Sequence, residues 1–218
     1  MGNTPPPKVI FFDAVGTLFG VKGSVGAAYA KIARQFGVQA DPQELDQAFS
    51  QSFRAAPPMA FPNASLANIP QQEYEWWQAI AQQTFDRVKL SDRFARFSDF
   101  FTALYEYFET ADPWFIYPDV DRVLRHWQGQ NVHLGIISNF DTRIYSVLPA
   151  LGLSSFFSSV TISTEVGAAK PDVRVFQAAL EKYDCPAAQA WHVGDSLKED
   201  YEGAKAAGLR AIWLNRSP

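Results

Sequence analysis

The chain has 218 residues, enough for one α/β domain with a modest insertion. Its 47% hydrophobic and 19% charged residues exclude a mainly disordered protein. The net charge of −4 disfavours general nucleic-acid binding. The single cysteine, Cys185, excludes an internal disulfide and is typical of a reducing compartment. No apolar run approaches the ~18 residues of a membrane span. We therefore expect a cytoplasmic protein that binds neither nucleic acid nor a membrane.

The first predicted element is a short buried strand over residues 8–12, which ends at a turn that begins with Asp13. From about Ser24 to Glu109 the apolar spacing is helical. Helix signals divide this stretch: the start signal Asp41-Pro42, the stop signal Pro57-Pro58, a second start at Pro70, and a fourth helix over about 94–108.

Strands and helices alternate in the rest of the chain. Strands are predicted over 132–137, 160–162, 190–193 and 211–214, and helices over 118–127, 173–182 and 201–207. Such alternation indicates βαβ units and a parallel sheet. The predicted fold class is α/β: a doubly wound, Rossmann-like parallel sheet formed by residues 1–20 and 110–218, with an all-helical domain of residues 21–109 inserted after the first strand.

Polar side chains follow several of the predicted strands. They are Asp13, the pair Ser138-Asn139, Lys170 in the following loop, and Asp195. Each residue alone is common in turns and helix caps. Ligands of open α/β sheets bind at the carboxyl ends of the strands, where the strand order reverses. Together these residues therefore predict a functional site at that edge.

Four segments carry a family resemblance: FFDAVGTLFG, IISNF, AAKPDVRVF and HVGDSLKEDYEGAKAAG. In order and spacing they resemble the four motifs of the haloacid dehalogenase superfamily of hydrolases. The resemblance extends from about residue 8 to the C-terminus. The helical insertion lies where that superfamily usually carries its helical cap.

The resemblance implies a role for each matching residue. Asp13 would be the nucleophile that forms a covalent aspartyl intermediate. Thr17 and Ser138 would donate hydrogen bonds to oxyanion or phosphoryl oxygens. Asn139 would line the substrate site beside Ser138. Lys170 would neutralise negative charge on the nucleophile and the substrate.

The resemblance also implies a metal site. Mg²⁺ would be held by Asp13, the backbone carbonyl of Val15 and Asp195, because this hard cation prefers oxygen ligands. Asp200 would orient Lys170 or support the metal site.

The chain departs from the phosphatases of the superfamily at Val15. Those enzymes carry a second Asp two residues after the nucleophile, which protonates the leaving oxygen and then activates water. Valine cannot transfer a proton, and acid–base help is typically worth about 10²–10⁴-fold. The haloacid dehalogenases of the superfamily also lack this Asp, but they use no Mg²⁺ and typically lack the Asp that matches Asp195.

Three interpretations stay open at this point. The first is a Mg²⁺-dependent phosphohydrolase, weakened by Val15, that acts on a small phosphate ester. The others are a metal-independent 2-haloacid dehalogenase and a non-catalytic ligand-binding or interaction protein on the same fold. Residues 74–117 hold 14 of the 32 aromatic residues, which we expect to form the helical core and to line an apolar pocket or an interaction surface. A homodimer is one option for the assembly.

Overall fold

Strand β1 (Val9–Phe12) has four buried apolar residues and lies at the centre of a five-stranded parallel sheet. The computed structural model describes residues 6–216, so residues 1–5 and 217–218 of the predicted core range lie outside it. The strand order is β5-β4-β1-β6-β7. The other four strands are β4 (His133–Ser138), β5 (Ser159–Ile162), β6 (Ala190–Gly194) and β7 (Arg210–Trp213).

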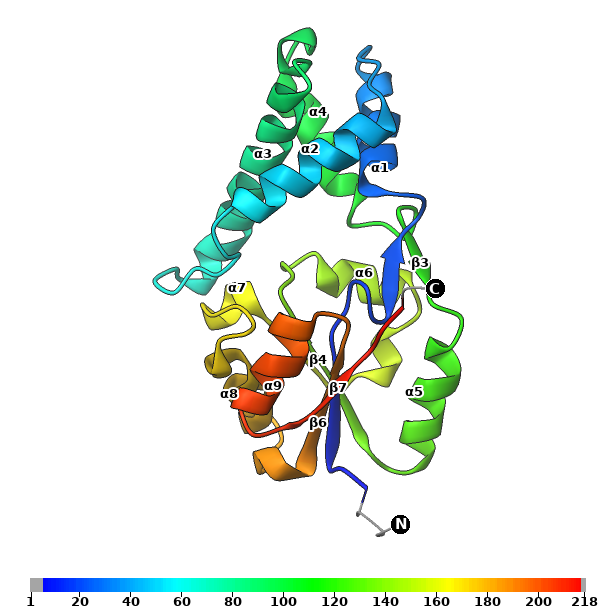
Figure 1. Ribbon diagram of the computed structural model, residues 1–218, viewed down its shortest axis with the longest axis vertical. Helices are drawn as coiled ribbons and strands as arrows, with labels where there is room; N and C mark the ends of the chain where they lie inside the picture. Colours follow the sequence, from blue (N-terminus) through cyan, green and yellow to red (C-terminus); the bar gives the residue numbers. More distant parts are fainter. Residues whose placement is uncertain (1–5, 217–218) are drawn as a thin grey trace.

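Successive residues of β1 face opposite sides of the sheet, as the two-residue period of a strand requires. Ile10 and Phe12 belong to the apolar cluster that includes residues of α5 (Val120–Gly129) and α6 (Ile144–Ala150). Val9 and Phe11 belong to a second cluster, with α8 (Val173–Glu181) and α9 (Gly203–Ala206). Helices therefore cover both faces (Figure 1), which confirms the predicted doubly wound α/β fold.

The helical stretch forms a separate layer above the carboxyl ends of the strands (Figure 1). Asp41 begins one helix there as expected, because its side chain accepts hydrogen bonds from the amides of Gln43 and Glu44. Phe85 and Phe100 lie in the apolar core of this layer. Its four helices, here called the cap, are α1 (Val25–Gln35), α2 (Pro42–Ala55), α3 (Ile69–Arg87) and α4 (Phe97–Tyr107).

Two short strands join the cap to the sheet layer. The chain leaves through β2 (Phe19–Val21) and returns through β3 (Trp114–Ile116), and the two pair antiparallel. The sequence analysis did not predict them, because three residues are too few for a periodic signal. The boundaries of the two predicted domains stay predictions.

The predicted start of the helix over 201–207 is wrong, because the helical segment begins four residues earlier, at Leu197. A π-helix, Leu197–Glu202, precedes the short helix α9. Helix α6 and the single turn α7 (Ser163–Val166) were also not predicted. Short 3₁₀ turns complete the secondary structure: Leu66–Asn68, Ser91–Arg93, Ser154–Phe156 and Ala187–Gln189. Within residues 6–216, no helix has the length and apolar character needed to cross a membrane.

Candidate active site

The carboxyl ends of three neighbouring strands meet below the cap. Asp13 follows β1, Ser138 ends β4, and Asp195 follows β6. β1 pairs with both β4 and β6 in parallel register, so these side chains emerge at one edge of the sheet. The strand order also reverses here, since the chain continues to β4 and β5 on one side of β1 and to β6 and β7 on the other.

The carboxylate of Asp13 is buried and held in place by two donors. Ser138 donates its hydroxyl to Oδ1 at 3.0 Å, and Lys170 donates its ammonium to the same oxygen at 2.6 Å. Burial raises the pKa of Asp13, the Lys170 charge opposes this shift, and the nearby Asp200 carboxylate adds to it. Asp13 therefore needs positive charge around it to stay ionised.

Lys170 supplies part of that charge from the interior. Its ammonium lies between the carboxylates of Asp13 and Asp200 and is bonded to both. Burial alone would favour the neutral amine, but the two carboxylates raise the pKa of Lys170. Asn139 fixes the loop that carries this lysine, because its amide accepts from Lys170 N at 2.8 Å and donates to Lys170 O at 3.0 Å. Asn139 thus positions Lys170.

Asp195 lies at the exposed edge of the same cluster. Its Oδ1 accepts a hydrogen bond from the buried Thr17 hydroxyl at 3.3 Å. Desolvation in the cleft raises the pKa of Asp195, and the carboxylates of Asp13 and Asp200 raise it further. Gly16 passes close to this group with a φ of 93°, and a Cβ there would lie 2.5 Å from Asp195 Oδ2. A side chain at position 16 would therefore both strain the turn and displace the carboxylate.

Asp200 is the most fully bonded acid of the cluster. Its Oδ1 contacts Lys170 and His192 Nε2, and its Oδ2 accepts from the amide of Ser196 at 3.0 Å. These bonds hold the pKa of Asp200 below its ordinary value despite its burial. Burial lowers the pKa of His192, so the neutral ring donates its Nε2 proton to Asp200. The π-helix turns Asp200 back toward the sheet, consistent with the frequent place of such turns at functional sites.

Three carboxylates form one group that could hold a metal ion. One oxygen from each of Asp13, Asp195 and Asp200 lies within 4.8 Å of the others. The oxygens of Asp200 already have partners, so Asp13 and Asp195 offer the freer ligands. Val15 lies beside them in the turn after β1, and the residue is 37% exposed. Its carbonyl stays a predicted ligand.

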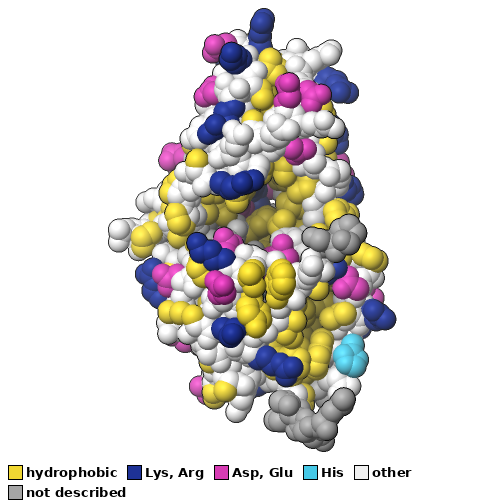
Figure 2. Space-filling model, viewed as in Figure 1, with side chains coloured by type: hydrophobic (Ala, Val, Ile, Leu, Met, Phe, Trp, Pro, Cys, Tyr) yellow, Lys and Arg dark blue, Asp and Glu magenta, His cyan; other side chains and the backbone are white. Residues whose placement is uncertain are grey.

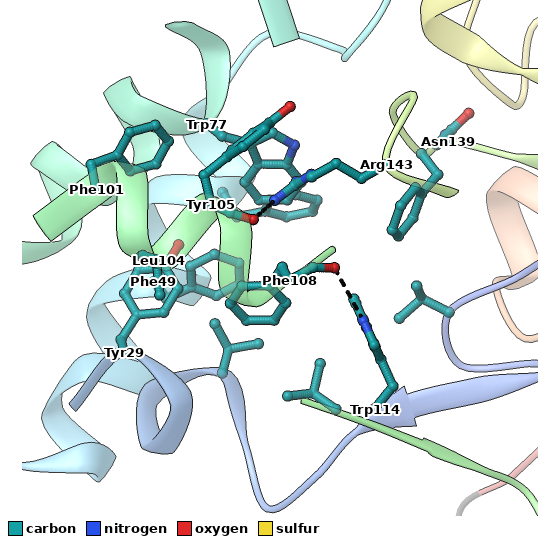
Figure 3. Close-up of a pocket in the computed structure, with 15 residues that line it drawn as sticks. Tyr29, Phe49, Trp77, Phe101, Leu104, Tyr105, Phe108, Trp114, Asn139 and Arg143 are labelled. Carbon is teal, nitrogen blue, oxygen red and sulfur yellow. Dashed lines mark hydrogen bonds between the residues drawn. The ribbon is translucent and has the colours of Figure 1, made fainter. Parts of the chain in front are cut away.

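The cap contributes a different kind of surface to the cleft. Figure 2 shows a hollow between the cap and the sheet layer, with hydrophobic side chains around it and acidic ones below. A cavity of about 290 Å³ lies here. It borders Val15 and Asn139 on the core side and is lined by aromatic side chains on the cap side, among them Tyr29, Phe49 and Phe101 (Figure 3). Aromatic residues of the segment 74–117 thus serve both as helical core and as cavity wall.

A buried polar contact docks the cap beside this cavity. Glu73 of α3 is fully buried, and its carboxylate accepts hydrogen bonds from Thr142 N, from the Thr142 hydroxyl and from the Thr164 hydroxyl. Trp77, one turn later, donates its indole N–H to Asp141 Oδ2 at 2.6 Å. Burial raises the pKa of Glu73, against the lowering effect of the hydroxyl donors. Thr142 lies four residues after Ser138, so the docked cap contacts the loop that follows the active-site serine.

The sequence analysis identified neither these contacts nor His192 as part of the site. His192 bonds directly to Asp200, and Glu73 and Trp77 reach the core across 64 to 91 residues of sequence. No local signal marks Glu73, since an acid on a helix is ordinarily exposed. For His192, its place in β6 two residues before Gly194-Asp195 was the available clue.

Fold and site together define an α/β protein of the doubly wound class, with an aspartate after its first strand and a helical cap above it. The family model of haloacid dehalogenase-like hydrolases matches residues 7–208. The chain therefore belongs to the haloacid dehalogenase-like hydrolases, and the resemblance noted in the sequence is confirmed.

Several relatives and solved structures are similar over nearly the whole chain. The haloacid dehalogenase-like hydrolase domain-containing protein 3 of Homo sapiens is 33% identical over 205 residues, 94% of this chain and 80% of the relative. The crystal structure of a HAD phosphatase from Thermococcus onnurineus is 25% identical with a TM-score of 0.63, covering 96% of this chain and 87% of that one. An L-2-haloacid dehalogenase structure has a TM-score of 0.71 at 19% identity, covering 99% and 89%, a likeness that shows the fold.

Proposed function

We propose that the chain is a Mg²⁺-dependent phosphohydrolase that acts through Asp13 on a small phosphate ester. The observation that carries this proposal is the group of three carboxylates of Asp13, Asp195 and Asp200, of which Asp13 and Asp200 are bonded to the buried Lys170. A halide displacement needs no such concentration of acidic ligands, whereas a phosphate ester brings negative charge that a metal ion must balance. The similarity to a solved HAD phosphatase supports the same choice.

The residues present suit a hard divalent cation. Asp13 and Asp195 supply carboxylate oxygens. Burial and the neighbouring carboxylates raise the pKa of each, so a cation between them would stabilise both ionised forms. Mg²⁺, when bound, would supply that charge and stabilise the negative phosphoryl oxygens. Asp200 would keep its present role, because its bonds to Lys170, His192 and Ser196 already occupy both oxygens.

The chain's own residues supply the nucleophile and its orientation. Ser138 and Lys170 both donate to Oδ1 of Asp13, which fixes the plane of the carboxylate. The Asp13 carboxylate attacks phosphorus, the bond from phosphorus to the ester oxygen breaks, and the leaving group departs as an alkoxide or phenolate that keeps the electron pair and takes a proton from solvent water. Water then attacks the aspartyl phosphate, inorganic phosphate departs, and Asp13 is regenerated.

Val15 deprives both of these steps of acid–base catalysis. The side chain beside the nucleophile has no acidic proton for the leaving oxygen and no base for the attacking water. Esters with good leaving groups therefore react faster in the first step than alkyl esters do. The second step lacks base help for every substrate, so the aspartyl phosphate should be long-lived.

The test is a paired assay with p-nitrophenyl phosphate and 2-chloropropionate, each with Mg²⁺ and with EDTA. We expect Mg²⁺-dependent release of p-nitrophenol and no release of chloride. The variant Asp13→Asn should lose roughly 10³-fold or more of the activity, because it removes the nucleophile. Chloride release in EDTA would establish the dehalogenase interpretation instead. No turnover of either substrate by a folded protein would favour the non-catalytic one.

A further inference from the structure

We propose that the cavity between the cap and the core binds a neutral, apolar alcohol moiety, so that the substrate is the phosphate monoester of an alcohol that carries about one aromatic ring or an alkyl group of similar size. This rests on the proposed function, and it adds the class of substrate. The cavity is lined by rings from all four cap helices and from β3, among them Tyr29 of α1, Phe49 of α2, Trp77 of α3, Phe101 of α4 and Trp114.

The size of the cavity sets the size of the group. Its volume is about 290 Å³. An apolar protein cavity of roughly 150 Å³ is known to bind benzene, and pockets for drug-sized ligands begin near 300 Å³. One ring with a short linker therefore fills this space, whereas a dinucleotide or an oligosaccharide exceeds it.

The charges around the cavity exclude a second ionic group on the substrate. Among the described residues that line it, Arg143 is the only charged one. Its guanidinium is already paired with Asp141 at 2.6 Å, donates to Tyr105 O at 3.2 Å, and lies 3.8 Å from the centre of the Tyr105 ring (Figure 3). Asp141 also accepts from Trp77. A carboxylate or ammonium on the substrate would lose its hydration and gain no free counter-charge.

The position of the cavity relates this apolar group to the phosphate. Its core side includes Val15 and Asn139, beside Phe140 and Arg143. Val15 lies two residues after Asp13, and Asn139 adjoins Ser138, whose hydroxyl bonds to Asp13. A phosphate at Asp13 thus places its alcohol at the mouth of the cavity. The apolar side chain of Val15 extends the apolar lining of the cavity toward Asp13. Val15 therefore not only lacks the acid–base function but also favours an apolar substrate.

The experiment compares phosphate esters with primary alkyl leaving groups, so that the need for protonation is similar. We expect kcat/KM for 2-phenylethyl phosphate to exceed that for ethyl phosphate by roughly 10- to 100-fold, the effect of burying one phenyl group. 2-Aminoethyl phosphate, with its ammonium, should be no better than ethyl phosphate. Equal kcat/KM for all three esters would overturn the proposal and leave the proposed function standing.

A cavity-filling variant tests the location. Val25 lines the cavity at the start of α1, and Val25→Phe should reduce the preference for 2-phenylethyl over ethyl phosphate by about 10-fold. Val88→Phe, the same substitution at the C-cap residue that follows α3, is the matched control and should keep the preference, because Val88 does not line the cavity. An unchanged preference in Val25→Phe, with folding verified by circular dichroism, would place the apolar site elsewhere and contradict the proposal.

Binding of the alcohol alone separates this inference from the proposed function. By calorimetry or NMR titration, 2-phenylethanol should bind the wild-type protein and Asp13→Asn alike, and Val25→Phe more weakly. Binding without turnover of any ester would support the cavity and contradict the phosphohydrolase. Turnover of esters without binding of 2-phenylethanol and without the preference would contradict the cavity alone.

Discussion

The core and the cap present opposite surfaces to the same cleft. On the core side, Asp13, Lys170 and Asp200 are buried charges whose hydrogen bonds fix them in place. On the cap side, aromatic rings line a cavity with no unpaired charge among the described residues. Under the proposed function, the core surface suits the step that every phosphate ester undergoes. The cap surface would then select among esters by the group attached to the phosphate, so that catalysis and substrate selection would lie on different parts of the chain.

Removing the central charge of the core should have the largest effect. Lys170→Met keeps the length of the side chain but leaves Asp13 and Asp200 without their shared partner. Breaking a buried ion pair costs about 3–5 kcal/mol, so the free energy of unfolding should fall by about that amount and turnover should be lost. Denaturant unfolding and steady-state assays measure the two effects.

Lys205→Met is the control for that substitution, since Lys205 is exposed on the surface of α9. It should change the free energy of unfolding by less than about 0.5 kcal/mol. A loss of stability in Lys170→Met no greater than in the control would contradict the role of the buried lysine.

Restoring a proton donor should have the next largest effect. Val15→Asp should raise the turnover of alkyl phosphates toward about 10²-fold, at the low end of acid–base help, because the surrounding residues do not yet hold an acid there. Aryl phosphates should gain less in the first step. Val15→Asn is the control, because an Asn side chain has nearly the shape of Asp but cannot transfer a proton. A gain in turnover in Val15→Asn equal to that in Val15→Asp would show that acid–base catalysis is not the cause.

Disturbing the polar contact between cap and core should have the smallest effect. Glu73→Gln replaces one acceptor oxygen with a donor that faces Thr142 or Thr164, which should lower the free energy of unfolding by about 1–3 kcal/mol. Glu75→Gln, on the exposed side of the same helix, should change it by less than about 0.5 kcal/mol.

The contribution of Glu73 to the free energy of unfolding also depends on pH. Burial raises its pKa above the ordinary value of 4.5, so the folded protein binds this proton more tightly than the unfolded chain does. The contribution of the protonated Glu73 to the free energy of unfolding is fully present below about pH 4.5 and is lost as the pH rises through the raised pKa. The difference in unfolding free energy between wild type and Glu73→Gln should therefore shrink with rising pH. A difference that grows with pH would contradict the raised pKa.

The sequence predicted those features that depend on local pattern. The alternation of strands and helices indicated the doubly wound sheet, and the residues after the strands predicted the meeting of Asp13, Ser138 and Lys170 at one edge. The catalytic roles of these residues stay predictions. The short strands β2 and β3 were missed because three residues show no period, and the π-helix was missed because one extra residue in a turn leaves the apolar spacing nearly unchanged.

The contacts between cap and core could not be predicted from the sequence for a different reason. Glu73 and Trp77 lie on a helix whose spacing shows which side is apolar but not what that side meets. Their partners, Asp141, Thr142 and Thr164, are far away in sequence. The cavity has the same origin, since its wall exists only once four cap segments and the loop after β4 are packed together.

The central claim is that the core performs nucleophilic chemistry through Asp13 without an acid–base partner at Val15. The most direct measurement is mass spectrometry of the acid-quenched protein after reaction with p-nitrophenyl phosphate and Mg²⁺. We predict one phosphoryl group on Asp13 in the wild type, a smaller steady-state fraction in Val15→Asp because its water attack is faster, and none in Asp13→Asn. Turnover with no phosphoryl group on Asp13 in wild type, or equal accumulation in Val15→Asp, would contradict the account.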